Sequence, residues 1–458
     1  MKSKVGEKTG AAAALEAHKI RSLYAGTEAM RRAGEKYLPK MPGEEKAEYD
    51  SRKAQSWLFN GVRKTVRDMV GRVFDVPVVL AEDAPERLVD WAEDIDLCGQ
   101  GLNAFAMAVF RDGMIPGISF VMVDAPRREG QVTITRAQSQ NLRPYLVHIP
   151  VESVLGWKST SVNNVQTLTQ FRFMETVDDD TADEFASDTI PQIRVLDLIG
   201  GRVSVRLYRE NVKSDWELYD EYQTGFKEIT VAPFYANRTG FFDAEPVLED
   251  LADVNIAHWQ SQSDQRNILH VARVPILWAA GYEGEGGIKV GTSVAITSSA
   301  PEFSLQFAEH SGAAIGAGRQ DLKDLEFQME ALGLQLLVQK TPGQSATGEA
   351  LDAAKETSQL AMMAQNLGDT LSTAAGWMAE YGGLGTSAVT VEVNTEYGAG
   401  GINQVELNTL LTSVNTGQIS RDTFIGELKR RGVLSAKVDP EDEAEKIDDE
   451  GLITDAAA

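Results

Sequence analysis

Residues 246–282, "PVLEDLADVNIAHWQSQSDQRNILHVARVPILWAAGY", join a helical pattern to a run that favours a strand. The helix is expected to begin at Pro246, with Asp243 nearby as its cap. Its first half has one mainly apolar face, formed by Leu248, Leu251, Val254 and His258. Its second half, "QSQSDQRN" (260–267), is polar all round, so we expect it to bury no stripe against its own domain. Such a helix either crosses solvent or packs against polar neighbours.

A second helical pattern follows a compact β segment. Residues 275–310 contain short runs typical of strands, separated by glycine and polar residues. Residues 318–337 then return to a helical period, with an apolar stripe at Leu322, Leu325, Met329 and Leu332. The sequence therefore predicts two helices that flank a small β module within one chain.

A polar loop and a long helix come next. Residues 338–347 are small and polar, and a helix is expected from 348 to Tyr381. Its apolar stripe comprises Leu360, Ala364, Leu367, Leu371, Ala374 and Met378. The run "GQSATG" (343–348) has the glycine spacing of a phosphate-binding loop, but Glu349 and Ala350 stand where Lys and Ser or Thr are needed. A carboxylate there would repel a triphosphate, so we expect no nucleotide hydrolysis.

The rest of the chain indicates an α+β class. Roughly the first 110 residues have helical periodicity, and residues 117–234 alternate with a period of two, which predicts a mostly antiparallel sheet. The acidic insertion 177–188 is expected to be a solvated hairpin tip, because it lacks the ligand spacing and turn glycine of a calcium loop. Near the end, Ser420 caps a helix that has Asp422 in its first turn, and an acidic tail follows.

Composition limits the possible partners. The chain has 458 residues and a formal net charge of −24, so charge attraction should not hold it on nucleic acid or on an anionic membrane. No run approaches the roughly 18 apolar residues of a membrane span. The single cysteine, Cys98, is expected to be a small buried thiol in a reducing compartment.

Catalytic and metal-binding patterns are missing from the sequence. The five histidines are scattered over different predicted elements, and His258 and His270 are too far apart to be a metal pair on one helix turn. We therefore expect no metal, no cofactor and no enzymatic activity, although carboxylates are abundant enough to leave a paired-acid hydrolase open. The terminal helix pair is similar to a DNA-reading helix-turn-helix, but a reading helix would present Ser420, Arg421 and Asp422 to the bases. That pattern does not favour a sequence-specific reader.

Four stretches, taken in order, resemble the bacteriophage portal protein, and more closely a portal subfamily catalogued as a domain of unknown function. They are "YLPKMPGEEKAEYDSRKAQSWLFNGVRKTVRDMVGRVFDVP" (37–77), "RPYLVHIPVESVLGW" (143–157), the run 246–282 quoted above, and "GQISRDTFIGELKRRGVL" (417–434). The resemblance covers most of residues 35–435 and excludes the acidic insertion and the tail.

The resemblance implies a portal fold with the following parts: a wing at 1–242, stem helices at 243–274 and 311–337, a β clip at 275–310, a tunnel loop at 338–347, a long helix and returning strand at 348–399, crown helices at 400–440 and an acidic tail at 441–458. It also implies a homo-oligomeric ring, usually dodecameric, at one capsid vertex of the virion, after assembly in the host cytoplasm. The alternative is another structural ring or adaptor of the virion.

The implied role is a channel for packaging and ejection of double-stranded DNA. The tunnel-loop residues that would contact DNA non-specifically are Gln339, Lys340, Thr341, Gln344 and Ser345. The clip residues that would dock partners are Trp278, Tyr282 and Lys289, for which core packing within the clip is an equal alternative. The implied partners are the major capsid protein, a scaffold, the terminase large subunit and a head-tail adaptor.

Overall fold

The computed structural model describes residues 4–9, 18–127, 140–179, 188–211, 215–272, 276–280, 304–308, 313–335, 359–385, 388–395, 404–430 and 434. The chain forms two compact units, Met1–Thr395 and Glu396–Ala458. Helices and antiparallel strands are both present, so the α+β class predicted from the sequence is confirmed.

Helices predominate in the first part of the chain, as predicted. They are α1 (His18–Ala25), α2 (Thr27–Ala33), α3 (Lys46–Gln55), α4 (Gly61–Val73), α5 (Glu86–Ala92) and α6 (Leu102–Gly113), with 3-10 turns at η1 (Lys4–Gly6) and η3 (Gly34–Lys36). The apolar stripe of α4 is buried at Val62, Val66, Met69 and Val73. On its polar side Lys64, Arg67 and Arg72 are exposed. The Nε of Arg63 instead donates to the Tyr24 carbonyl at 2.6 Å.

The predicted antiparallel strands are confirmed, but they form two main sheets. One contains β2 (Ile118–Asp124), β3 (Tyr145–Ile149) and β9 (Val231–Tyr235) in the order β3-β2-β9. The other contains, in chain order, β4 (Val154–Val162), β5 (Val165–Asp178), β6 (Thr189–Ile199), β7 (Arg202–Glu210) and β8 (Trp216–Gln223). The 3-10 turn η4 (Val151–Ser153) links β3 to β4. Asp178 pairs with Thr189, so the acidic insertion leaves from the end of the β5–β6 hairpin, and its central residues, 180–187, lie outside the described part.

An aromatic cluster joins the two sheets. Phe120 from β2 lies 5.5 Å from Phe171 of β5 and 5.4 Å from Phe242, measured between ring centroids. Phe242 adopts a φ of 56°, and its backbone N–H donates to the Tyr235 hydroxyl at 2.8 Å. All three phenylalanines are nearly or completely buried, so the cluster lies within the hydrophobic core that the two sheets share.

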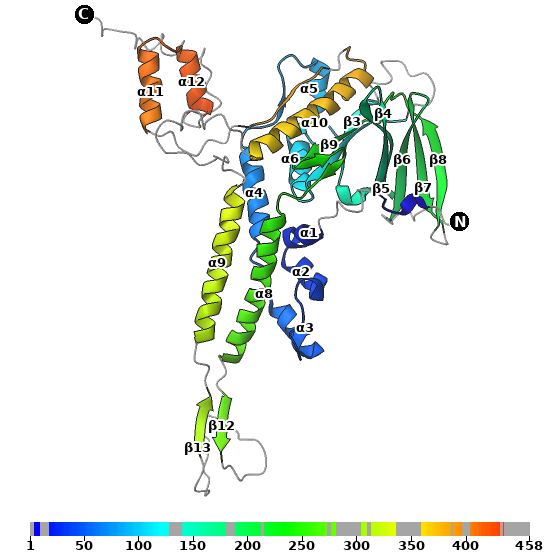
Figure 1. Ribbon diagram of the computed structural model, residues 1–458. Helices are drawn as coiled ribbons and strands as arrows, with labels where there is room; N and C mark the ends of the chain where they lie inside the picture. The colour runs from blue at the N-terminus through cyan, green and yellow to red at the C-terminus, as the bar shows by residue number, and fades with distance from the viewer. Residues whose placement is uncertain are drawn as a thin grey trace, which may run out of the picture. The chain divides into compact units, whose positions relative to one another are not determined.

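Two long helices extend from this body. They are α8 (Glu249–Ala272) and α9 (Ala313–Gln335), which lie side by side (Figure 1). Between them in sequence, β12 (Ile276–Ala280) and β13 (Ser304–Ala308) form an antiparallel pair. Helix α8 begins at Glu249 and not at the predicted Pro246. Asp243 does not cap it, because Asp243 belongs to β11 (Asp243–Ala244), which pairs with β10 (Arg238–Gly240).

The long helix after the predicted loop is described as α10 (Gln359–Tyr381). Its predicted apolar stripe is confirmed, since every member from Leu360 to Met378 is buried. The helix covers the edge of β9: the Asn366 side-chain amide donates to the Tyr235 carbonyl at 3.0 Å, and the Thr370 hydroxyl lies 3.1 Å from the Pro233 carbonyl. Beyond α10, β14 (Val391–Glu392) pairs with β1 (Val79–Leu80).

The second unit contains α11 (Gln404–Asn415) and α12 (Arg421–Arg430). The predicted cap is confirmed, because the Ser420 hydroxyl accepts the Thr423 backbone N–H at 3.1 Å. Asp422 lies in the first turn of α12, also as predicted. The acidic tail lies outside the described residues.

Cys98 is exposed, so the prediction of a buried thiol is wrong. It lies in the turn between α5 and α6, where its backbone N–H donates to Asp96 Oδ1 at 2.8 Å and that of Gly99 donates to Asp94 Oδ1 at 2.7 Å. Leu97 has a φ of 61° in the same turn. These side-chain caps hold the turn at the surface, where the thiol contributes nothing to the core.

Candidate functional site

The helices that lead to the predicted clip and tunnel loop form the best-described part of the candidate site. All five predicted tunnel-loop residues fall within 336–358, which lies outside the described residues. Tyr282 and Lys289 of the predicted clip also lie outside the described residues. Trp278 lies in β12, where its Cα is paired with that of Gln306 in β13. The structure therefore describes the helices on either side of the predicted contact segments, which are α8, α9 and α10.

Two side chains in the polar half of α8, Ser263 and Gln265, are buried within its own unit, which corrects the prediction that this half buries nothing there. Ser263 is 1% exposed and Gln265 is 5% exposed. The side-chain amide of Gln265 donates to the Ile315 carbonyl of α9 at 3.0 Å. A Cβ at Gly318 would overlap the side-chain oxygen of Gln265, so a larger residue there would force the Gln265 side chain, which bonds to Ile315, to shift. A hydrogen bond from a buried polar side chain therefore joins α8 to α9 in this region.

A buried arginine clamps the other side of α8. Arg52 of α3 is 6% exposed and binds both carboxylate oxygens of Glu44, at 2.7 and 2.8 Å. It also donates to the Pro39 carbonyl at 2.9 Å and to the Ser263 hydroxyl at 3.3 Å. The guanidinium lowers the pKa of Glu44 by hydrogen bonding, so the pair is charged at neutral pH. The stretch 37–77 that resembles the portal opening signature thus builds the clamp.

Asn255 ties α8 to the start of α4. It is fully buried; its side-chain nitrogen donates to the Phe59 carbonyl at 2.8 Å, and its oxygen accepts the Val62 backbone N–H at 3.2 Å. Val62 is the second residue of α4, so this N–H has no acceptor within the helix. Asn60 caps the neighbouring Arg63 N–H at 2.8 Å. One α8 side chain therefore completes the N-terminal cap of another helix.

His258 lies between the helix pair and the α3–α4 connection. It is 1% exposed, its Nε2 lies 3.3 Å from Glu326 Oε1 of α9, and its ring centroid lies 5.3 Å from that of Phe59. Burial lowers the pKa of His258, while Glu326 and, more weakly, Asp321 oppose this shift. The imidazole is therefore held as the neutral form, and its contacts with Phe59 and Glu326 join α8 to its neighbours.

Small residues let α9 approach α4. A Cβ on Gly61 would lie 2.8 Å from the Met329 sulfur, and a Cβ on Gly333 would lie 2.9 Å from the Thr65 hydroxyl oxygen. Both distances are shorter than real Cβ contacts, so a larger residue at either position would force the Met329 or Thr65 side chain to shift. Met329 is 3% exposed and is the buried member of the predicted α9 stripe.

The described residues contain no group of three or more His, Cys, Asp or Glu side chains placed to hold a metal ion. Within that same part of the chain, no helix is long and apolar enough to span a membrane.

Replacing Asn255 by alanine should lower the free energy of unfolding by about 2–3 kcal/mol, because the Phe59 carbonyl and the Val62 N–H would stay buried without partners. Urea unfolding followed by circular dichroism measures this. Asn267 of the same helix is exposed, and N267A should change stability by less than about 0.5 kcal/mol. Equal losses in the two variants would contradict the capping role.

The His258 pKa predicts a pH dependence. Its value in the folded chain lies below the 6.5 of the unfolded chain, so neutral His258 supports the fold above that pH, and protonation favours unfolding as the pH falls below it. H258Q should flatten the fall in stability below about pH 6.5, with a difference of at most about 1.4 kcal/mol per pH unit.

Urea unfolding at several pH values, compared with H270Q on the exposed face of α8, tests this. If wild type and H258Q lose stability in parallel on acidification, His258 is not the group responsible.

Comparison with known proteins adds a family match and three structural likenesses. The model of a family described as "Domain of unknown function (DUF4055)" matches residues 247–382, which run from just before α8 to just past α10. No match was found among the curated proteins.

The chain is similar in structure to chains described as "Neck of empty GTA particle computed with C6 symmetry" (12% identity, covering 81% of this chain and 89% of that chain, TM-score 0.41), "Neck of native GTA particle computed with C12 symmetry" (12%, 80% and 89%, 0.40) and "Virion of native gene transfer agent (GTA) particle" (12%, 81% and 88%, 0.40).

Proposed function

We propose that the chain is a subunit of a phage portal ring, which forms the channel for double-stranded DNA at one vertex of the virion. The observation that carries this proposal is the helix pair α8 and α9 with the antiparallel strands β12 and β13 between them in sequence. This is the stem-and-clip order that the resemblance implies. A globular enzyme has no need of a strand pair carried on two long helices.

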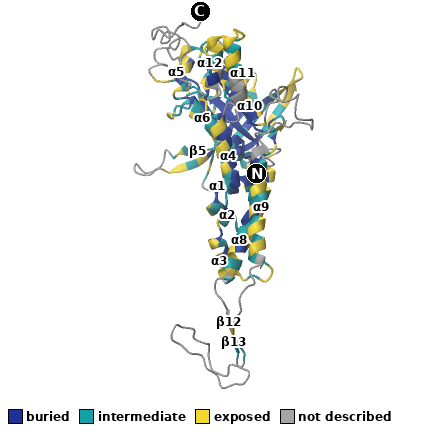
Figure 2. Cartoon of the chain, turned by 90° about the vertical axis from the view of Figure 1, so that its left-hand side faces the viewer, coloured by how far each residue is buried: buried dark blue, intermediate teal, exposed yellow. Residues whose placement is uncertain are grey.

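The exposed surface of α9 supports assembly with other copies. Within the described residues, Met329 and Gly333 are the buried positions on this helix, and Figure 2 shows exposed residues along its length. Phe327 is 72% exposed, which is unusual for a large aromatic side chain on a polar helix. In a ring, the adjacent subunit would cover this face and remove Phe327 from water.

Charge explains how DNA would pass through the ring. Each Lys or Arg that neutralises a phosphate adds affinity, and several together would hold the duplex in place. A chain of net charge −24 offers little attraction over most of its surface. In the proposed ring, the tunnel loop would make the transient contacts, through Gln339, Lys340, Thr341, Gln344 and Ser345.

The proposed ring converts no substrate. The loop run "GQSATG" lacks the lysine that a nucleotide-hydrolysing loop requires, so a separate terminase would supply the ATPase. The terminase large subunit and a head-tail adaptor would dock at the clip near Trp278, Tyr282 and Lys289. The capsid protein and the scaffold would surround the ring at the vertex.

Electron microscopy of the purified protein tests the assembly directly. Negative-stain images should show rings with a central hole, and light scattering should give a mass that is a multiple of 49.9 kDa. A protein that stays monomeric under a range of assembly conditions would exclude the proposal.

Replacing Lys340 and Gln344 by alanine should impair DNA retention or packaging while rings still form, because these side chains would contact phosphates in the bore. A matched control, K158A/Q223A, removes the same two residue types from exposed positions of the five-stranded sheet. Retention of DNA in packaging extracts measures the effect. If the loop variant behaves like the control, the loop does not touch DNA.

A further inference from the structure

Two exposed aromatic side chains lie on different sides of α8. Phe327 of α9 is 72% exposed, and Trp57, in the connection between α3 and α4, is 39% exposed. The hydroxyl of Ser56, next to Trp57, lies 2.9 Å from that of Ser263 of α8, whereas Gln265 of α8 bonds to α9. Residues two apart on a helix project about 200° apart, so α9 and the α3–α4 connection contact different sides of α8 (Figure 1).

Both aromatic side chains lie at the same level along α8. Glu326, which precedes Phe327, has its Oε1 3.3 Å from Nε2 of His258. The ring centroid of the same histidine lies 5.3 Å from that of Phe59, two residues after Trp57. At the level of His258, therefore, α9 presents one exposed aromatic side chain and the α3–α4 connection presents another.

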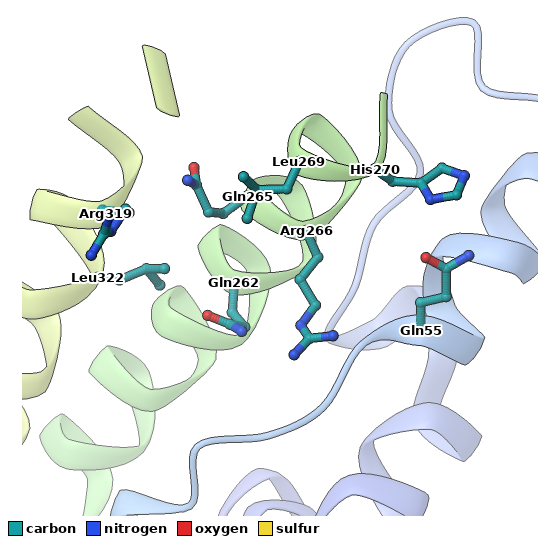
Figure 3. A pocket seen from close by; sticks show the side chains of 8 residues that line it. All are labelled: Gln55, Gln262, Gln265, Arg266, Leu269, His270, Arg319 and Leu322. Atoms are coloured by element: carbon teal, nitrogen blue, oxygen red, sulfur yellow. The ribbon is translucent and has the colours of Figure 1, made fainter. Parts of the chain in front are cut away.

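A free positive charge accompanies Trp57. The guanidinium of Arg266 lies 5.6 Å from the centroid of the Trp57 ring. Arg266 is exposed, and it has no carboxylate partner among the described residues. Figure 3 shows Arg266 on the side of α8 that faces Gln55 of α3, whereas Arg319 belongs to α9 on the other side. The Trp57 surface thus combines an aromatic ring with a cation, as is common at the centre of protein interfaces.

The surroundings of Phe327 have the opposite charge. The charged residues one turn away from Phe327 on α9 are Lys323, Asp324 and Glu330, and all three are exposed. Asp324 accepts a hydrogen bond from the neutral amide of Gln320 at 2.7 Å. Within the described part of the chain, neither Asp324 nor Glu330 forms an ion pair. The two surfaces are therefore complementary: each has an exposed aromatic side chain, and their net charges are opposite.

We propose that Phe327 of one copy packs on Trp57 of the next copy around the ring, with Asp324 facing Arg266. The contact rests on the proposed portal function, and it identifies the surface that receives α9 of the adjacent subunit. Subunits of a closed ring are related by rotation alone, so with the helix pair along the ring axis each surface meets its partner at the same level. The contact is heterologous, since its two halves lie on different sides of α8, and it therefore repeats until the ring closes.

Cysteine cross-linking tests the contact. With the native thiol removed by C98S, W57C/F327C should form disulfides between copies, which give a ladder of multiples of 49.9 kDa on a non-reducing gel. V89C/F327C, also in C98S, is the matched control, because Val89 of α5 is exposed but lies outside the proposed contact. Rings that give no more ladder than the control, or a disulfide within a single chain, overturn the inference.

Exchange of the two charges is a second measurement, in which both aromatic side chains are kept. R266D should raise the protein concentration needed for half-assembly by about tenfold or more, because it places two carboxylates side by side. R266D/D324R should restore assembly, since the pair forms again with its charges reversed. R67D is the control, because Arg67 is exposed on α4 and also lacks a carboxylate partner among the described residues.

Analytical ultracentrifugation measures the assembly of these variants. If R266D assembles like R67D, or if R266D/D324R assembles no better than R266D, Asp324 does not face Arg266 and the proposed contact is wrong.

Electron microscopy of the same samples separates this inference from the proposed function. Rings that neither cross-link nor respond to R266D refute the contact and leave the portal proposal in place. Ladders from a chain that never forms rings refute the portal proposal and keep the contact, as an open association of copies. A chain that gives neither ladders nor rings refutes both.

Discussion

The arrangement of the first unit depends on hydrogen bonds that bury a polar face of α8. Asn255, Ser263 and Gln265 are each met by a partner from a different segment: the α3–α4 connection, α3 and α9. Apolar contact is non-directional, whereas these bonds have fixed geometry and are expensive to leave unmade. They therefore set the rotation of α8 about its own axis relative to α3, α4 and α9. The guanidinium of Arg52, held by Glu44, is the strongest single element of this network.

The sequence predicted buried faces correctly where the buried residues are apolar and recur with a regular period. The stripe from Leu360 to Met378 defined the buried face of α10, and alternation located the strands of the two main sheets. It failed where polar groups are buried, because hydrophobic periodicity does not register them. The residue type of a serine or glutamine on α8 does not reveal whether its side chain faces water or a carbonyl. Cys98 failed for a related reason: residue type alone indicated burial, while the Asp94 and Asp96 caps place its turn at the surface.

The sequence predicted some parts of the candidate site and missed others. The order of helix, strand pair and helix could be predicted from the glycine and polar residues that separate the runs and from hydrophobic periodicity. The long helix after the loop could be predicted in the same way. The buried polar contacts of α8 were not predicted, because Gln265 and Ile315 belong to separate helices far apart in sequence, and only the packing of α8 on α9 brings them together.

The attachment of α10 to β9 has a consequence for sequence change. The helix holds the strand through the carbonyl oxygens of Pro233 and Tyr235, which every amino acid possesses. These two hydrogen bonds therefore do not depend on which side chains β9 carries, provided that the strand persists, whereas burial still constrains Val231, Ala232 and Phe234. The reciprocal freedom does not exist, because Asn366 supplies its contact through its side chain. Amino-acid substitutions at this contact are therefore expected to be unequal. The strand residues that supply carbonyl oxygens can change more readily than the helix residue that supplies a side chain.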